Sequence, residues 1–139
     1  VLGALQRGGS IRLTVEKRRD RKTLHRFIEG QAPDAKNVYT DDWHAYDGIE
    51  DEKTKHRRVT HSEGEYVRGD VHTNGIEGVF SMLKRSIVGS YHQISAKHLP
   101  AYLDEFEFRF DNRDNPYMFR DTLLRLIAAD KVTYEELTA

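Results

Sequence analysis

Two short stretches contain the residues whose types and spacing could support chemistry. The first is VYTDD, in which Asp41 and Asp42 follow a run of strand-forming residues. Open α/β sheets place ligands at strand ends, so one of these carboxylates would face a crevice above the sheet. The alternative is that an aspartate caps the following turn, a common role for this residue. With two acids available, one can cap the turn while the other binds a ligand in the crevice.

The second stretch is HTNGIEGVFSMLKR, residues 72–85, whose apolar residues recur at helical spacing. Its buried stripe is expected to contain Ile76, Phe80, Leu83 and Ile87. At about 100° per residue, Glu77 and Lys84 fall together at the edge of this stripe, and Asn74 lies one turn before Glu77. These three side chains could face one cleft beside the core. The alternative is that they are ordinary edge residues of an amphipathic helix.

Carboxylates from the two stretches could share a metal ion. Mg²⁺ is a hard cation that prefers oxygen ligands. Two such ions roughly 4 Å apart activate a nucleophile and stabilise the leaving oxygen in phosphodiester chemistry, and bridging them requires a further carboxylate. Zinc is not expected, because the chain has no cysteine and its histidines lack the spacing of a helical ligand pair.

The composition sets limits on the class of protein. The chain has 139 residues, which fits one domain with a core of moderate size. It contains no apolar run near the ~18 residues that a membrane span needs, and no signal-peptide pattern, so a cytoplasmic location is expected. The net charge of −1 gives no overall sign of nucleic-acid binding. Residues 16–26 and 53–58 are locally basic, although such runs also occur on solvated surfaces.

The elements that must position these residues follow a mixed order. We expect a hairpin over 1–15, a short helix over 20–31 with Gly30 as its stop signal, and a strand over 36–42. A helical turn is expected over 42–49 and a strand over 56–61. After a polar loop, further helices are expected over 74–88, 95–110 and finally 118–130. Strands joined by crossover helices predict an α/β layer architecture with a parallel component. Because the chain opens directly in a strand, we expect it to be a fragment.

Together these segments resemble the DDE catalytic domain of small bacterial insertion-sequence transposases, the ISXO-type group. VYTDDWHAYDGI is similar to the second-aspartate segment of that group, and HRRVTHSEGEYVRGDVHTNGIEGVFSMLKR to its third-acid segment. GSYHQISAKHLPAYLDEFEFRF is similar to the tail that follows. The resemblance covers nearly the whole chain, so residues 1–139 are expected to form one RNase H-like domain. It implies a bacterial cytoplasmic enzyme that cuts and joins DNA with Mg²⁺ or Mn²⁺.

The resemblance also implies roles for individual residues. Asp41 would be the second acid and Glu77 the third, both as metal ligands, with 35 residues between them. Asn74 would orient the site, and Lys84 would bind a DNA phosphate or restrain Glu77. The residues expected to contact DNA are Arg57, Arg58, Lys84, Arg85, Lys97 and His72. The expected partners are transposon ends, target DNA and further copies of the protein, in a homodimer or larger assembly.

One departure from the family pattern concerns the first aspartate. In the family it lies on the first strand, upstream of the segment that VLGALQRGG matches, and Asp20 in its basic turn cannot replace it. The isolated chain is therefore expected to be inactive. The strands at 1–6 and 38–40 would each expose an unpaired edge, which a partner copy or a rearranged sheet must protect. A complete five-stranded sheet within one chain would contradict this hypothesis.

Two other readings of the sequence stay open. The chain could be a non-catalytic nucleic-acid-binding or assembly module left from a decayed element, or another RNase H-like nuclease such as a resolvase. An acidic residue about one strand before Val1 in the complete gene would favour the transposase. A gene that starts at Val1 would favour the non-catalytic module.

Overall fold

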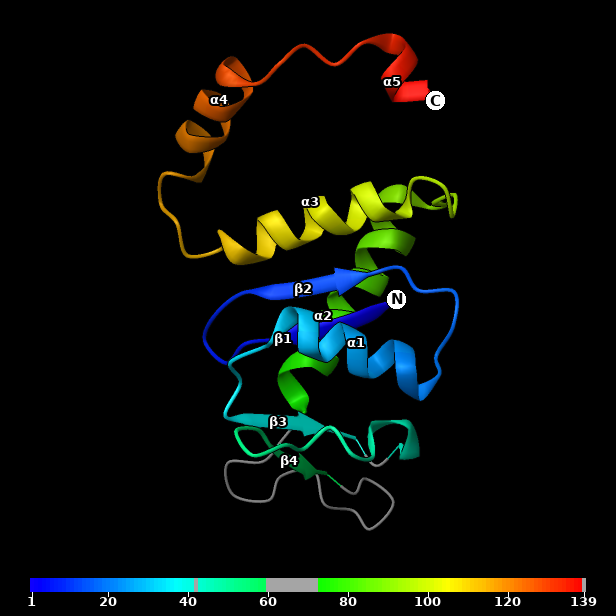
Figure 1. The fold of residues 1–139 in the computed structure, drawn as a ribbon. Helices are drawn as coiled ribbons and strands as arrows, with labels where there is room; N and C mark the ends of the chain where they lie inside the picture. The colour runs from blue at the N-terminus through cyan, green and yellow to red at the C-terminus, as the bar shows by residue number, and fades with distance from the viewer. Residues whose placement is uncertain (42, 60–72, 139) are drawn as a thin grey trace.

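The structure is a computed structural model that describes residues 1–41, 43–59 and 73–138 (Figure 1). Its strands are β1 (Leu2–Leu5), β2 (Ile11–Thr14), β3 (Asn37–Thr40) and β4 (Lys55–Arg58). Its helices are α1 (Arg21–Gln31), α2 (Asn74–Ser86), α3 (Leu99–Asp111), α4 (Met118–Ala128) and α5 (Tyr134–Thr138). A 3₁₀ turn, η1 (His44–Tyr46), follows β3, and a π-helical turn, η3 (Ile87–Tyr91), extends α2. The expected mixed α/β class is confirmed.

The described strands form two separate sheets of two strands each. β1 pairs antiparallel with β2 through a hairpin whose turn places Gly8 at φ 65°, a conformation that favours glycine. β3 pairs in parallel with β4. Figure 1 shows β2 and β3 running in the same direction, with β1 and β3 as the facing edges. Among the described residues neither edge pairs with a further strand, so the expected unpaired edges are present.

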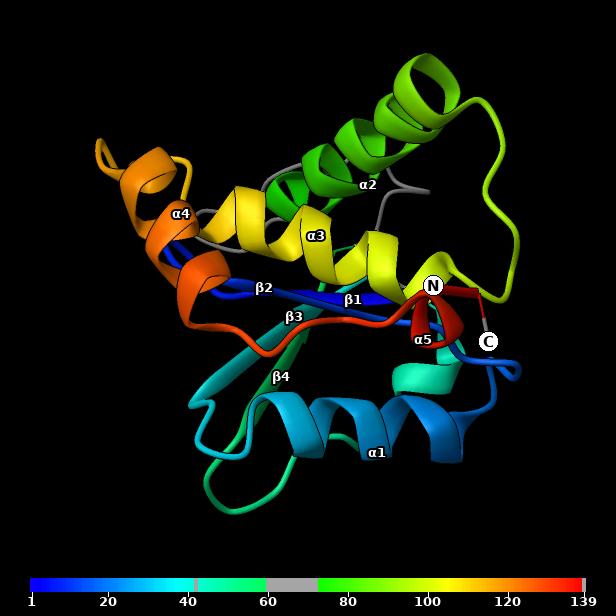
Figure 2. The ribbon, with the colours of Figure 1, turned by 90° about the horizontal axis from the view of Figure 1, so that it is seen from above.

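Helices lie on both sides of the strands. Seen from above, α1 covers one side, and α2 and α3 cover the other (Figure 2). The core on the second side brings together β2, α2 and α3 through Ile11, Leu13, Val79, Leu83, Leu103 and Phe106. Helix α2 passes so close to β1 that a Cβ on Gly3 would lie 2.8 Å from the ring of Phe80. Packing therefore leaves no room for a side chain at position 3.

Helix α3 protects the outer edge of β2. The backbone N–H of Ile11 donates to the Asp111 carboxylate at 2.9 Å, and the backbone N–H of Leu13 donates to Glu107. Arg12 adds an ion pair to Asp111 at 2.9 Å. Two carboxylates one turn apart on a helix thus accept the hydrogen bonds that another strand would otherwise take.

Several element boundaries differ from the sequence expectations. Helix α3 begins at Leu99, four residues later than expected, because Pro100 is tolerated only in the first turn of a helix. Helix α1 begins after Asp20, whose carboxylate accepts from the Thr23 N–H at 2.9 Å, and it continues through Gly30 to Gln31. Gly30 does not end it, because glycine tolerates helical geometry and the following Pro33 restricts the residue before it. Strand β4 begins one residue earlier than expected and ends at Arg58. The short helix α5 follows α4, which was expected to be the last helix.

The buried face of α2 is wider than the expected stripe. Val79 and Leu83 are buried, whereas Ile76, Phe80 and Ile87 are half-buried against the core. Two surfaces explain the difference, because Ile76 and Phe80 lie against β1 while Val79 and Leu83 join the cluster that includes α3. In the described part of the chain, no helix combines the length and the apolar character needed to cross a membrane.

Candidate metal and nucleic-acid site

Asp41 is exposed and lies immediately after the carboxyl end of β3. Its Oδ1 accepts a hydrogen bond from the Trp43 backbone N–H at 3.3 Å, which is beyond the usual N–H···O range. Asp41 therefore caps the following turn only loosely, and its carboxylate stays accessible. Asp42, the second acid of this stretch, lies outside the described residues.

Glu77 lies in the first turn of α2, with an exposed side chain. The hydroxyl of Thr73, a residue that is only 8% exposed, donates to Glu77 Oε1 at 2.7 Å. A carboxylate in this position is also favoured by the positive end of the helix dipole. Asn74, the first residue of α2, is exposed beside this turn. The sequence analysis missed Thr73, and the sequence carries no standard capping box here, because Glu77 lies four residues after the threonine whereas the box places its acid three residues after it.

The two carboxylates lie in the same part of the molecule. Both views place the carboxyl end of β3 near the first turn of α2 (Figures 1 and 2). Beside Asp41, burial raises the pKa of the Tyr46 hydroxyl, and the negative charge of Asp41 raises it further. Two exposed carboxylates suit a hard divalent cation. Within the described ranges, however, no three acidic or histidine side chains are grouped closely enough to hold a metal.

Lys84 lies two turns beyond Glu77 on α2 and is exposed. Seven residues of helix separate the two by about 10 Å along the axis. Among the described residues Lys84 has no ion-pair partner, and it lines a shallow hollow of about 220 Å³ with Phe80, Ser81, Leu83 and Ile87. Its position therefore suits a phosphate contact better than a restraint on Glu77. Arg85, the next residue, is also exposed.

Strand β4 divides its basic residues between two faces, because side chains alternate across a strand. Arg58 forms an ion pair with Asp47, and His56 shares a hydrogen bond with the Thr40 hydroxyl at 2.8 Å. Burial lowers the pKa of His56, and the charge of Arg58 lowers it further. His56 and Arg58 thus have partners inside the fold.

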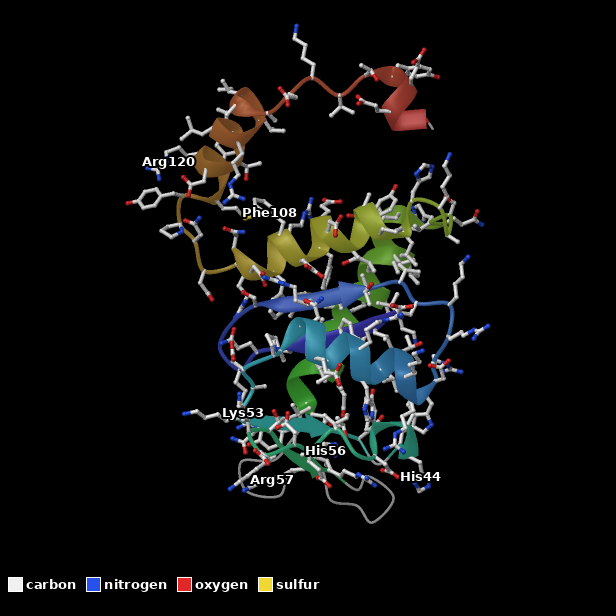
Figure 3. The ribbon with its side chains drawn as sticks, in the orientation of Figure 1. His44, Lys53, His56, Arg57, Phe108 and Arg120 are labelled. Atoms are coloured by element: carbon white, nitrogen blue, oxygen red, sulfur yellow. The ribbon has the colours of Figure 1, made fainter. Side chains whose placement is uncertain are left out.

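The other face of β4 carries Lys55 and Arg57, which are both exposed. In Figure 3, Arg57 and the nearby Lys53 extend outward at the β3–β4 end of the molecule. Lys55 was missed by the sequence analysis, although the two-residue period of a strand pairs it with Arg57. This face offers two cations at strand spacing to a polyanion.

The remaining expected DNA contacts are not gathered at this face. Lys97 is exposed in the segment before α3, which lies at the opposite end of α2 from β4 (Figure 1). His72 lies outside the described residues. The structure therefore places Arg57 at the β3–β4 end, Lys84 and Arg85 along α2, and Lys97 beyond it.

Comparisons with known proteins agree with one another. A family model described as an ISXO2-like transposase domain matches residues 1–111. An uncharacterized protein in transposable element ISH50 of Halobacterium salinarum is 40% identical over 73 residues, which cover 52% of this chain and 24% of that protein. An uncharacterized transposase-like protein of Haemophilus influenzae is 31% identical over 77 residues, 55% of this chain and 61% of that protein. The chain thus matches less than two thirds of either relative. No solved structure matches it.

Proposed function

The chain belongs to the ISXO2-like transposase domain family, and on this premise we propose that it acts in DNA transposition by metal-dependent cleavage and joining of phosphodiester bonds. The observation that carries the proposal is the extent of the family match, because residues 1–111 include Asp41, Asn74, Glu77 and Lys84. The names of both relatives refer to transposition and support the same role.

We further propose that the two sheets are parts of one RNase H-like sheet that lacks its first strand. Strand polarity supports this, because one added strand could run antiparallel to β1 and parallel to β3 (Figure 1). The hydrogen-bond pattern agrees. Gln6 pairs with Ser10 and Thr40 with Val59, so by alternation the backbone groups of Gly3 and Tyr39 point to the unpaired edges.

In this proposal Asp41 and Glu77 are the second and third acids and hold Mg²⁺ or Mn²⁺. When bound, the ion would activate the attacking hydroxyl and stabilise the leaving oxygen. The hydrogen bond from Thr73 fixes the direction of the Glu77 carboxylate, and Asn74 lies beside it to orient the site. The isolated chain is inactive, because the described residues supply two of these carboxylates and no third group beside them.

DNA is the proposed partner, held through phosphate contacts. Arg57, Lys84 and Arg85 are exposed and suited to this role, whereas Arg58 would first have to leave Asp47. Phosphate contacts require only well-placed positive charge. Transposon ends and target DNA would be bound by a homodimer or larger assembly, in which Lys97 and His72 could contribute from other parts of the surface.

The test is Mn²⁺-dependent strand transfer by the product of the complete gene, with Asp41→Asn and Glu77→Gln variants. Glu77→Gln retains an oxygen that can accept from Thr73, so the helix start stays intact. Asp104→Asn is the matched control, because Asp104 is an exposed carboxylate on α3 away from the site. Both site variants should lose more than the roughly 10–100-fold that an outer-shell substitution costs. Full activity of either variant would contradict the site.

A non-catalytic nucleic-acid-binding module is the second candidate, favoured by the absence of a third metal-binding group near the two acids within the described ranges. In that case the complete gene product would bind DNA without strand transfer. Arg57→Ala and Lys84→Ala should then weaken binding of every DNA sequence and flatten its salt dependence by about one unit per phosphate contact.

A further inference from the structure

Helix α4 presents its apolar side to solvent. Phe119, Leu123, Leu126 and Ile127 are 82%, 47%, 68% and 75% exposed. Their spacing of i, i+4, i+7 and i+8 places them in a band about 100° wide along one side of the helix. We call these four residues the α4 stripe.

The opposite side of α4 is the one that contacts the rest of the protein. Met118, Asp121 and Thr122 are half-buried, and the Arg125 guanidinium lies 5.5 Å from the centre of the Phe108 ring on α3. Figure 3 shows Phe108 on the side of α3 that faces α4, while Arg120 extends away from the body. A surface helix normally buries its apolar side, so α4 has the opposite orientation to that expected of an isolated domain.

We propose that the α4 stripe is the contact surface for a second copy of this chain, in an antiparallel pair of α4 helices around a two-fold axis. Three of the four stripe residues, Phe119, Leu123 and Ile127, are complementary to themselves in that arrangement, while Leu126 lies opposite the partner's Arg120. With Leu123 on the axis, Phe119 lies opposite the partner's Ile127, and Ile127 lies opposite the partner's Phe119. A two-fold interface requires this reciprocal pattern.

The size and charge of the surface fit this partner. The four stripe side chains offer roughly 100 Å² apiece, so two copies would bury about 800 Å² through them, the size of a weak and reversible interface. Residues 118–130 carry two arginines and two aspartates, so two copies do not repel. DNA suits the surface less well, because Arg120 is already paired with Asp121 at 2.8 Å.

This inference is independent of the proposed catalytic role. Helix α4 lies outside residues 1–111, the part that matches the transposase family. An α4 pair could join two catalytic domains, whether or not their acids bind a metal.

Single cysteines test the arrangement directly, because the natural chain has none. Under mild oxidation, Leu123→Cys alone should form a disulfide-linked dimer. Phe119→Cys alone should not, since the two copies of this position lie about 12 Å apart along antiparallel helices. A mixture of Phe119→Cys and Ile127→Cys chains should form the mixed dimer. Efficient cross-linking of Phe119→Cys to itself would overturn the antiparallel pair.

Sedimentation of the unmodified chain provides the second readout. We expect a concentration-dependent dimer that Leu123→Glu and Ile127→Glu weaken at least tenfold, with circular dichroism unchanged because both side chains are exposed. Val88→Glu is the control, since Val88 is 71% exposed but lies outside the stripe. A monomer at all concentrations, or stripe variants that lose DNA binding without any change in mass, would overturn the proposal.

Discussion

The contact between Asp111 and the edge of β2 leads to a prediction whose size can be worked out. Ile11 is fully buried, and its N–H donates to the Asp111 carboxylate at 2.9 Å. Asp111→Ala removes this acceptor, and an unsatisfied buried N–H costs about 1–3 kcal/mol. The ion pair from Arg12, a half-exposed side chain, adds no more than about 1 kcal/mol. We therefore expect a loss of about 2–3 kcal/mol.

Urea unfolding followed by circular dichroism measures this loss. With a slope of about 2 kcal/mol/M, the midpoint should fall by roughly 1 M. Asp111→Asn keeps an oxygen for Ile11 and loses only the ion pair, so its midpoint should fall by less than half as much. Asp114→Ala is the control, because the Asp114 side chain is 88% exposed, and it should change stability by less than about 0.5 kcal/mol.

Amide hydrogen exchange separates this mechanism from a general weakening of α3. Protection of the Ile11 amide should fall in Asp111→Ala and persist in Asp111→Asn. If Asp111→Ala is as stable as Asp114→Ala, or if the Ile11 amide keeps its protection, the hydrogen bond from Ile11 to the Asp111 carboxylate does not stabilise the edge of β2.

Three further predictions concern other parts of the fold. The pKa of His56 is lowered in the folded protein, so the unfolded chain binds more protons as the pH falls. The free energy of unfolding should therefore be highest above the ordinary histidine pKa near 6.5 and should decline below it. A His56→Gln variant that keeps the full decline would contradict this. Gly3→Ala should destabilise the protein by about 1–3 kcal/mol, because the new methyl group would meet the ring of Phe80. Gly78→Ala, in an open position on α2, should stabilise the protein by up to about 1 kcal/mol. Thermal unfolding distinguishes the two signs. Leu103→Ala should cost about 2–5 kcal/mol in chemical denaturation, because Leu103 is 1% exposed in the core, and a loss below about 1 kcal/mol would place that side chain outside it.

The elements were largely predictable from local patterns. The hairpin, α1, β3, α2, α3 and α4 all follow from periodicities of two or 3.6 residues and from turn residues such as Gly8. The end of α1 could not be predicted in this way, because a glycine inside a helix and a glycine that ends a helix look alike in the sequence. The wider buried face of α2 also escaped prediction, since it depends on contacts with both β1 and α3.

The candidate site was only partly predictable. Resemblance to a family singled out Asp41 and Glu77, and the match over residues 1–111 supports that family, while their metal-binding role stays a prediction. The partners of individual side chains could not be foreseen. Arg58 and Arg57 are adjacent and chemically identical, yet Arg58 pairs with Asp47 whereas Arg57 extends into solvent. Alternation along β4 separates them only once the strand's position is known.

By itself, the sequence determined which segments become helices and strands, because these preferences act over a few neighbouring residues. Tertiary structure alone decided how distant segments meet. Asp111 accepts a hydrogen bond from a strand a hundred residues earlier, β1 and β3 have unpaired edges within the part of the chain that the structure describes, and α4 turns its apolar stripe outward. Each depends on packing between segments far apart in the chain, which a local pattern does not encode.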